Sequence, residues 1–103
     1  MRFLVITKMR HPLPPQSATA LMDAMGSWRD RHADHIEQIW SFAGIPGGAG
    51  IANVNSLEEL DGVMAEFPLA PFSEIEVLPL VDFEGSIDRA RQAMQAMAVG
   101  GRQ

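Results

Sequence analysis

Apolar and polar residues recur along the chain with two different periods, which predict the order of strands and helices. Residues 2–9, rich in β-branched side chains, predict a first strand. Alternating apolar and polar residues predict further strands at about 35–44, 49–54 and 74–80. Apolar residues spaced three or four positions apart predict helices at about 17–32 and 56–66. The expected order is βαββαβ.

Prolines and capping residues mark where these elements end. The prolines between residues 12 and 15 end the first strand, because proline cannot donate a backbone hydrogen bond. Ser17 is placed to cap the first helix, while Ser56 and Glu59 have the spacing of a capping box at the start of the second. Pro79 places the last strand at a sheet edge, or itself at an unpaired position.

This order predicts an α+β fold, a ferredoxin-like sandwich of an antiparallel sheet with both main helices on one face. A further amphipathic helix is expected at about 86–98, capped by Gly85 and Ser86. The chain then divides into a ferredoxin-like domain at 1–82 and a C-terminal helical extension at 83–103.

The second face of such a sheet is bare, and we expect a second copy of the chain to cover it. On the second strand this face would carry Ile39 together with His35, Glu37 and Ser41. The size of the chain also favours self-association, since a domain of 103 residues buries a modest core and is marginally stable alone.

Composition and charge narrow the classes of partner. With 47% hydrophobic and 20% charged residues, the chain is typical of a globular protein. No apolar run is long enough to cross a bilayer and no signal-peptide cleavage site follows the start, so we expect no membrane partner and a cytoplasmic location. A net charge of -5 with a single lysine, Lys8, argues against nucleic acid as a partner. The absence of cysteine excludes disulfides and thiolate chemistry.

His32 is the best candidate for a catalytic residue. It lies near the end of the first helix on the apolar face, with Trp28 one turn before it. An imidazole titrates near neutral pH, so His32 is suited to act as a proton shuttle. The alternative is a histidine that caps the helix by bonding to its free carbonyl groups.

Trp28, Trp40 and Phe72 are candidates for the wall of an apolar pocket that holds a flat small molecule, and the alternative is that they are core residues. The glycine-rich stretch at 44–50 lacks the Lys-Ser/Thr of a nucleotide-binding loop, and we expect a hairpin turn there. The two histidines at 32 and 35 straddle a helix end rather than sharing one helical turn, so we expect no metal site.

Two polar groups are further candidates. His35 and Glu37 would share a strand face and line a pocket between two copies, or instead form a salt link with Arg29 or Arg31. Lys8, with two basic residues that follow it and no acid nearby in sequence, could hold a carboxylate or a lactone oxygen, or only cap the end of the first strand.

Three stretches resemble the muconolactone delta-isomerase family, whose members carry a W-x-x-A-G stretch and an L-P-L-x-P-[FY]-x-x-I-E-V run at matching separations. The stretches are WSFAG at 40–44, SLEEL at 56–60 and FPLAPFSEIEVLPL at 67–80. The resemblance covers roughly residues 1–82. It implies a dimeric α+β barrel, assembly into larger homo-oligomers, and a proton shift without cofactor that moves the double bond of a lactone during aromatic catabolism.

The leading interpretation is therefore an isomerase-like protein that acts by proton transfer on a small lactone or aromatic-derived acid, without cofactor or metal. His32 would be catalytic, and the substrate-binding residues would be Trp28, Trp40, Phe72, Lys8 and His35. The alternative is a non-catalytic small-molecule-binding or assembly protein that kept the barrel and lost the catalytic site. Heme- or oxygen-linked monooxygenase chemistry of the wider barrel superfamily would rest on fold analogy alone.

Overall fold

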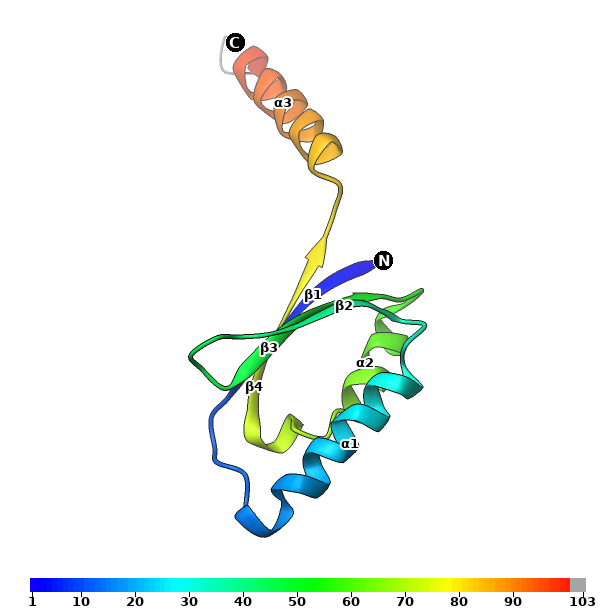
Figure 1. Cartoon of the computed structure of the whole chain (residues 1–103). Helices are drawn as coiled ribbons and strands as arrows, with labels where there is room; N and C mark the ends of the chain where they lie inside the picture. Colours follow the sequence, from blue (N-terminus) through cyan, green and yellow to red (C-terminus); the bar gives the residue numbers. More distant parts are fainter. Residues whose placement is uncertain (101–103) are drawn as a thin grey trace.

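A computed structural model describes residues 1–100, and the elements in this part of the chain follow the expected order. They are β1 (Arg2–Met9), η1 (Pro15–Ser17), α1 (Ala18–Arg31), β2 (Ile36–Ser41), β3 (Gly47–Asn53), α2 (Leu57–Ala65), η2 (Ala70–Phe72), β4 (Ser73–Leu80) and α3 (Phe83–Gly100). The strands form one antiparallel sheet in the order β2-β3-β1-β4, and α1 and α2 lie on one side of it (Figure 1). The predicted ferredoxin-like α+β fold is confirmed, with the proline-containing β4 at an edge.

The helix starts agree with the capping chemistry only in part. The Ser56 hydroxyl accepts a hydrogen bond from the Glu59 amide at 3.1 Å, as the capping box predicts. The Ser17 hydroxyl makes no such bond, and the short η1 turn leads into α1 instead. The cap at Ser56 could be predicted from the sequence because Ser56 and Glu59 lie within one helical turn.

Helix α3 begins at Phe83, three residues before the predicted start. The Asp82 carboxylate accepts a hydrogen bond from the Gly85 amide at 3.1 Å, so Asp82 is the capping residue and not Gly85 or Ser86. The end of the predicted extension, at 101–103, lies outside the described residues. Neither α3 nor any other helix within residues 1–100 is long and apolar enough to cross a membrane.

The register of the sheet decides which side chains share a face. The face toward the helices includes the opposed pairs Phe3–Ala52, Val5–Gly50 and Thr7–Gly48. The alternating positions form what we call the bare face, which no described helix covers and which includes Leu4, Ile6, Ile51 and Leu78. Its apolar centre is available to another protein surface.

A bulge in β2 changes which of its side chains meet the helices. The pairing with β3 shifts between Ile36 and Gln38, so that Ile39 pairs with Gly50 and Ser41 with Gly48 on the helix side. The expectation that Ile39 and Ser41 lie on the bare face is therefore wrong, because an inserted residue inverts the alternation that follows it. Of the predicted group, Glu37 remains on the bare face.

The core lies between the sheet and the two helices, in two adjoining clusters. One contains Phe3, Val5, Ala52, Val54 and Leu60, and the other contains Trp28, Val63 and Phe67. The indole Nε1 of Trp28 donates a hydrogen bond to the carbonyl oxygen of Val63 at 2.8 Å. Since the only polar atom of this buried ring is satisfied, Trp28 links α1 to α2 without a desolvation penalty.

Candidate functional site

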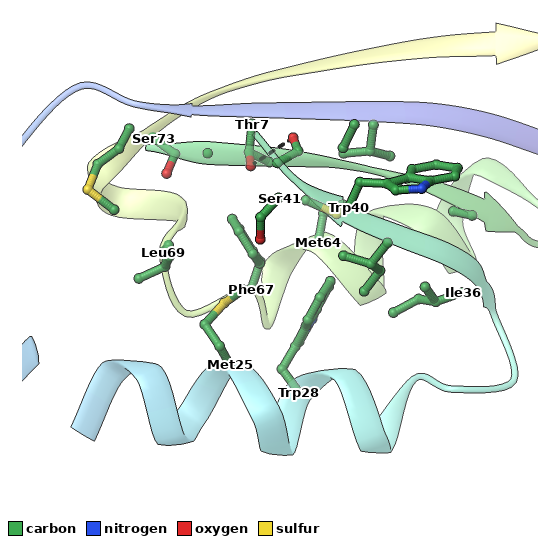
Figure 2. Close-up of a pocket in the computed structure, with 18 of the residues that line it drawn as sticks. Thr7, Met25, Trp28, Ile36, Trp40, Ser41, Met64, Phe67, Leu69 and Ser73 are labelled. Carbon is green, nitrogen blue, oxygen red and sulfur yellow. Dashed lines mark hydrogen bonds between the residues drawn. The ribbon is translucent and has the colours of Figure 1, made fainter. Parts of the chain in front are cut away.

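A cavity of about 360 Å³ lies between the sheet and the helices (Figure 2). Its helix side is formed by Met22, Met25 and Trp28 of α1, by Val63 and Met64 of α2, and by Phe67 and Leu69 beyond α2. Its sheet side is formed by residues of β1, β2 and β3, most of them at helix-facing positions, and by Ser73 of β4. Pockets for small molecules in proteins commonly measure about 300–1,000 Å³, so this cavity has room for one small ring compound.

Strand β3 makes this space by contributing almost no side-chain volume. Its helix-facing residues are Gly48, Gly50 and Ala52. A Cβ atom added at Gly50 would lie 3.1 Å from the carbonyl oxygen of Gln38 and 3.6 Å from the Ile39 side chain. A larger residue at Gly50 would therefore both crowd β2 and fill the cavity.

The expected hairpin turn at residues 44–50 is shorter than the glycine pattern suggested. Gly47 already belongs to β3, and its φ of 146° with a Cβ position only 2.2 Å from the Thr7 carbonyl oxygen requires glycine there. The glycines thus serve the strand more than the turn. Glycines at alternate positions opposite an apolar strand are the signal that could have revealed the cavity.

The side-chain oxygen atoms of the described wall are the hydroxyls of Thr7, Ser41 and Ser73, on the sheet side (Figure 2). Thr7 Oγ1 donates a long hydrogen bond of 3.4 Å to the Gly48 carbonyl oxygen, so it can exchange this partner for a ligand. None of the described residues that line the cavity is ionisable. A neutral ring with carbonyl or hydroxyl oxygens fits this wall better than a buried carboxylate does.

Of the three predicted aromatic residues, Trp28 places its ring in the cavity wall. Trp40 borders the cavity, but it pairs with Ala49 on the bare-face side, is 49% exposed, and turns its indole away from α1 (Figure 2). Phe72 lies in η2 outside the lining residues, and its carbonyl oxygen accepts the amide hydrogen of Arg10 at 2.7 Å. The structure does not bring these three rings together.

His32 follows α1 directly and lies beside the cavity rather than in its wall. Its Nε2 is 2.5 Å from Oε2 of Glu66, the residue that follows α2, and its side chain is 16% exposed. Its ring centroid is 6.0 Å from that of Trp28, which does line the cavity. Glu66 fixes the orientation of the imidazole, and Trp28 connects it to the cavity.

The other predicted polar residues lie apart from His32. The Nδ1 atom of His35 is 2.9 Å from Oε1 of Glu59 on α2, and Glu37 pairs with Arg2. Within residues 1–100, the predicted salt link of this pair with Arg29 or Arg31 therefore does not form, and those two arginines lie beside Asp30 and Glu66. A local reading of the sequence missed Glu59 as the partner of His35 because it lies 24 residues further along the chain.

Lys8 lies on the bare face, opposite Glu74 in the register of β1 and β4. Arg10 forms an ion pair with the same Glu74. The basic cluster therefore has an acidic neighbour, which the sequence hides because the two strands are far apart in it.

No local pattern in the sequence predicts a cluster of Arg2, Glu37 and Asn53 at the edge of the bare face, which we call the polar bracket. Arg2 of β1 donates to Glu37 of β2 at 2.7 and 2.9 Å, and Asn53 of β3 donates to it at 3.1 Å. The hydrogen bonds from Arg2 and then Asn53 hold the pKa of the Glu37 carboxyl below its usual value of 4.5. The bracket fastens three strands together.

The fold and the cavity define a class, an α+β protein with a ferredoxin-like sandwich and a small-molecule cavity between its sheet and helices. Among residues 1–100, no three His, Asp or Glu side chains gather closely enough to hold a metal ion.

A sequence model of the family described as muconolactone delta-isomerase matches residues 1–86, and the chain belongs to this family. The resemblance seen in the sequence is thereby confirmed.

Solved structures agree with this assignment. The crystal structure of a muconolactone isomerase is 27% identical, superposes with a TM-score of 0.72, and covers 80% of this chain and 90% of its own. A 5-chloro-2-hydroxyhydroquinone dehydrochlorinase from Burkholderia phenoliruptrix, solved with 2,5-dihydroxybenzoquinone, is 18% identical at a TM-score of 0.63, with coverage of 82% of this chain and 98% of its own. The second likeness shows the fold alone. A search of curated proteins found no match.

Proposed function

We propose that the protein binds a small lactone or related ring compound in the cavity between its sheet and helices. The cavity carries this proposal, because its volume of about 360 Å³ and its apolar wall suit one ring. The hydroxyls of Thr7, Ser41 and Ser73 can donate hydrogen bonds to ring oxygens. The similarity to a muconolactone isomerase supports a lactone as the class of ligand.

The charge of the wall constrains how such a ligand lies. No described lining residue is a cation, so an acid would keep its ring in the cavity and its carboxylate outside. Met9 lines one end of the cavity and is followed by Arg10, beyond the end of β1, whereas Lys8 lies on the opposite, bare face. We assign the ligand carboxylate to this end, where a charged group remains hydrated.

For the reaction we propose a proton shift within the ligand that moves a double bond, with His32 as the shuttle. The imidazole would take a proton from one carbon of the lactone and return it to another, so no cofactor or second substrate is consumed. The contact of His32 with Trp28 and its orientation by Glu66 support this role. Because His32 is outside the wall, the imidazole must reach the ligand beside the Trp28 ring.

A second candidate function is binding without catalysis, and one observation favours it. Since the described wall holds no ionisable side chain, the cavity alone offers no general base. The alternative predicted from the sequence, a binding or assembly protein that lost its catalytic site, has this arrangement.

We also propose that the chain forms homodimers or larger homo-oligomers through the bare face. Its apolar side chains include Leu78 and Leu80, which are 40% and 37% exposed. Exposed apolar surface on a sheet is stabilised when a second sheet covers it. We place the protein in the cytoplasm and in aromatic catabolism on the strength of its family.

The test uses muconolactone with the full-length protein, measuring binding by calorimetry and double-bond migration by proton NMR. We expect binding, and we expect His32→Gln to bind equally while its turnover falls about 10²–10⁴-fold. His11→Gln is the matched control, since His11 is exposed and outside the cavity wall.

The three outcomes are distinct. An unchanged rate in His32→Gln would show that His32 is not the shuttle. Binding without any turnover by the unmodified protein would favour the non-catalytic function. No binding of the lactone or of an uncharged ring analogue would overturn the assignment of the cavity.

A further inference from the structure

Helix α3 leaves the body of the molecule as an isolated rod (Figure 1). The radius of gyration is 18.8 Å, while a compact chain of this length has about 13 Å. All large apolar side chains of α3 are exposed, including Phe83 at 72%, Met94 at 69% and Met97 at 75%. The family match ends at residue 86, so most of α3 lies beyond the region that defines the family.

The spacing of these apolar residues indicates what kind of surface covers them. Phe83, Ile87, Ala90, Met94 and Met97 follow one another at intervals of 4, 3, 4 and 3 residues. Among the large apolar side chains of α3, all but Val99 lie on this line, and the other apolar residues off it are small alanines. The stripe of large side chains is therefore narrow, as in a helix that packs on another helix, whereas a helix that packs on a globular body has a wider apolar face. The occupant indicated is therefore a helix.

The charges of α3 argue against other occupants. Within residues 83–100, Glu84 and Asp88 balance Arg89 and Arg91, so the helix has no basic face. Membrane surfaces and nucleic acids bind helices with an excess of Lys and Arg. An isolated helix of this length is marginal in water and requires packing for its stability.

We propose that α3 pairs in antiparallel orientation with α3 of a second copy of the chain. When Phe83 lies opposite Met94 of the second copy, Glu84 lies beside Arg91 of the second copy, and symmetry repeats the pair. A parallel pair would place Arg91 beside Ser86 and form no ion pair across the seam. Charge complementarity thus selects the antiparallel arrangement.

The α3 pair is a contact separate from the bare face. Two short helices bury less than the roughly 1,200–2,000 Å² of a stable protein interface, so the pair acts together with another contact. When a chain makes two self-complementary contacts with two different copies, the assembly grows beyond a dimer. If the bare face forms dimers, α3 pairs join these dimers into a larger assembly.

The test measures the assembly size of full-length variants by sedimentation velocity over a range of protein concentrations. Glu84→Arg and Arg91→Glu should each raise the dissociation constant of the larger assembly about tenfold, because each places like charges across the seam. The double variant should have a dissociation constant within about twofold of that of the unmodified protein, because the ion pair is restored with its charges exchanged. Arg29→Glu, which makes the same charge change as Arg91→Glu on the exposed face of α1, should have no effect.

Restoration by the double variant would support the pair, with circular dichroism showing that each variant is folded. Weaker assembly in both single variants without restoration would place α3 on another part of the second copy and overturn the antiparallel pair. Unchanged assembly in the single variants, or an unmodified protein no larger than a dimer, would also overturn it. Ligand binding in the cavity does not enter this test, so the two proposals fail independently.

Discussion

Gly50 shapes the candidate site through the side chain that it lacks. It faces the helices, opposite Val5 on β1 and Ile39 on β2, where most strands carry a side chain that fills the core. The same holds for Gly48, opposite Thr7. The volume available to a ligand therefore depends on two glycines that carry no side chain, so neither is recognisable as a site residue by its chemistry.

We predict that Gly50→Val weakens binding of a ring ligand about 10- to 100-fold, because the added methyl groups occupy the cavity and overpacking costs about 1–3 kcal/mol. The measurement is titration calorimetry with the ligand that the unmodified protein binds. Gly62→Ala is the control, since a Cβ at Gly62 on α2 meets nothing within 4 Å. It should leave binding unchanged and stabilise the fold by about 0.4–1 kcal/mol. Equal affinity of Gly50→Val would place the ligand elsewhere.

At the scale of elements, the bulge in β2 organises both faces of the sheet. It turns Ile39 toward the cavity, and it leaves Glu37 on the bare face within reach of Arg2 and Asn53. The Glu37 carboxylate thus joins β1, β2 and β3 through side-chain hydrogen bonds. These bonds add to the backbone pairing of β1 and β2 with the glycine-rich β3 that lies between them.

The bracket gives a pH dependence whose sign follows from the lowered pKa of Glu37. Between the lowered folded value and the usual 4.5, the unfolded chain binds more protons, so the free energy of unfolding rises with pH in that window. The contribution is fully present above it and is lost as pH falls through the folded pKa. We predict that Glu37→Gln flattens this rise, measured by urea unfolding between pH 3 and 7. An identical slope in both proteins would show that the bracket adds nothing to stability.

The sequence predicted the elements well because their signals are local. Period, proline and the Ser56 cap all act within a few residues, and the order of strands and helices followed from them. The bulge at Glu37 has no such signal, so Ile39 and Ser41 were placed on the wrong face. Of the site, Trp28 was found from its place on a helix face. Contacts such as His32 with Glu66 join residues 34 apart, and no local pattern reports them.

At the scale of the whole molecule, one chain leaves two apolar surfaces open. The bare face of the sheet and the seam of α3 both expose large apolar side chains. Principal extents of 68 × 27 × 22 Å describe a shape with a small body and a long arm. Such a chain gains stability from its neighbours more than a compact one does.

We predict that the melting temperature rises with protein concentration, because assembly stabilises the folded state by mass action. The measurement is calorimetry over a 100-fold range centred on about the micromolar level. A melting temperature that stays constant over this range, in a protein that sediments as a monomer, would contradict self-association through either surface.

The glycines of β3 also set a limit on how this protein can be made more robust. Glycine loses more conformational freedom on folding than any other residue, and an unfilled core forgoes packing contacts, so the cavity is maintained against stability. Laboratory selection for heat resistance alone should therefore enrich larger apolar residues at Ser41 and Ser73, which line the cavity, and not at Gly48, where a Cβ would lie 2.4 Å from the Trp40 carbonyl oxygen. Such variants would survive the selection with the capacity to hold a ligand already lost.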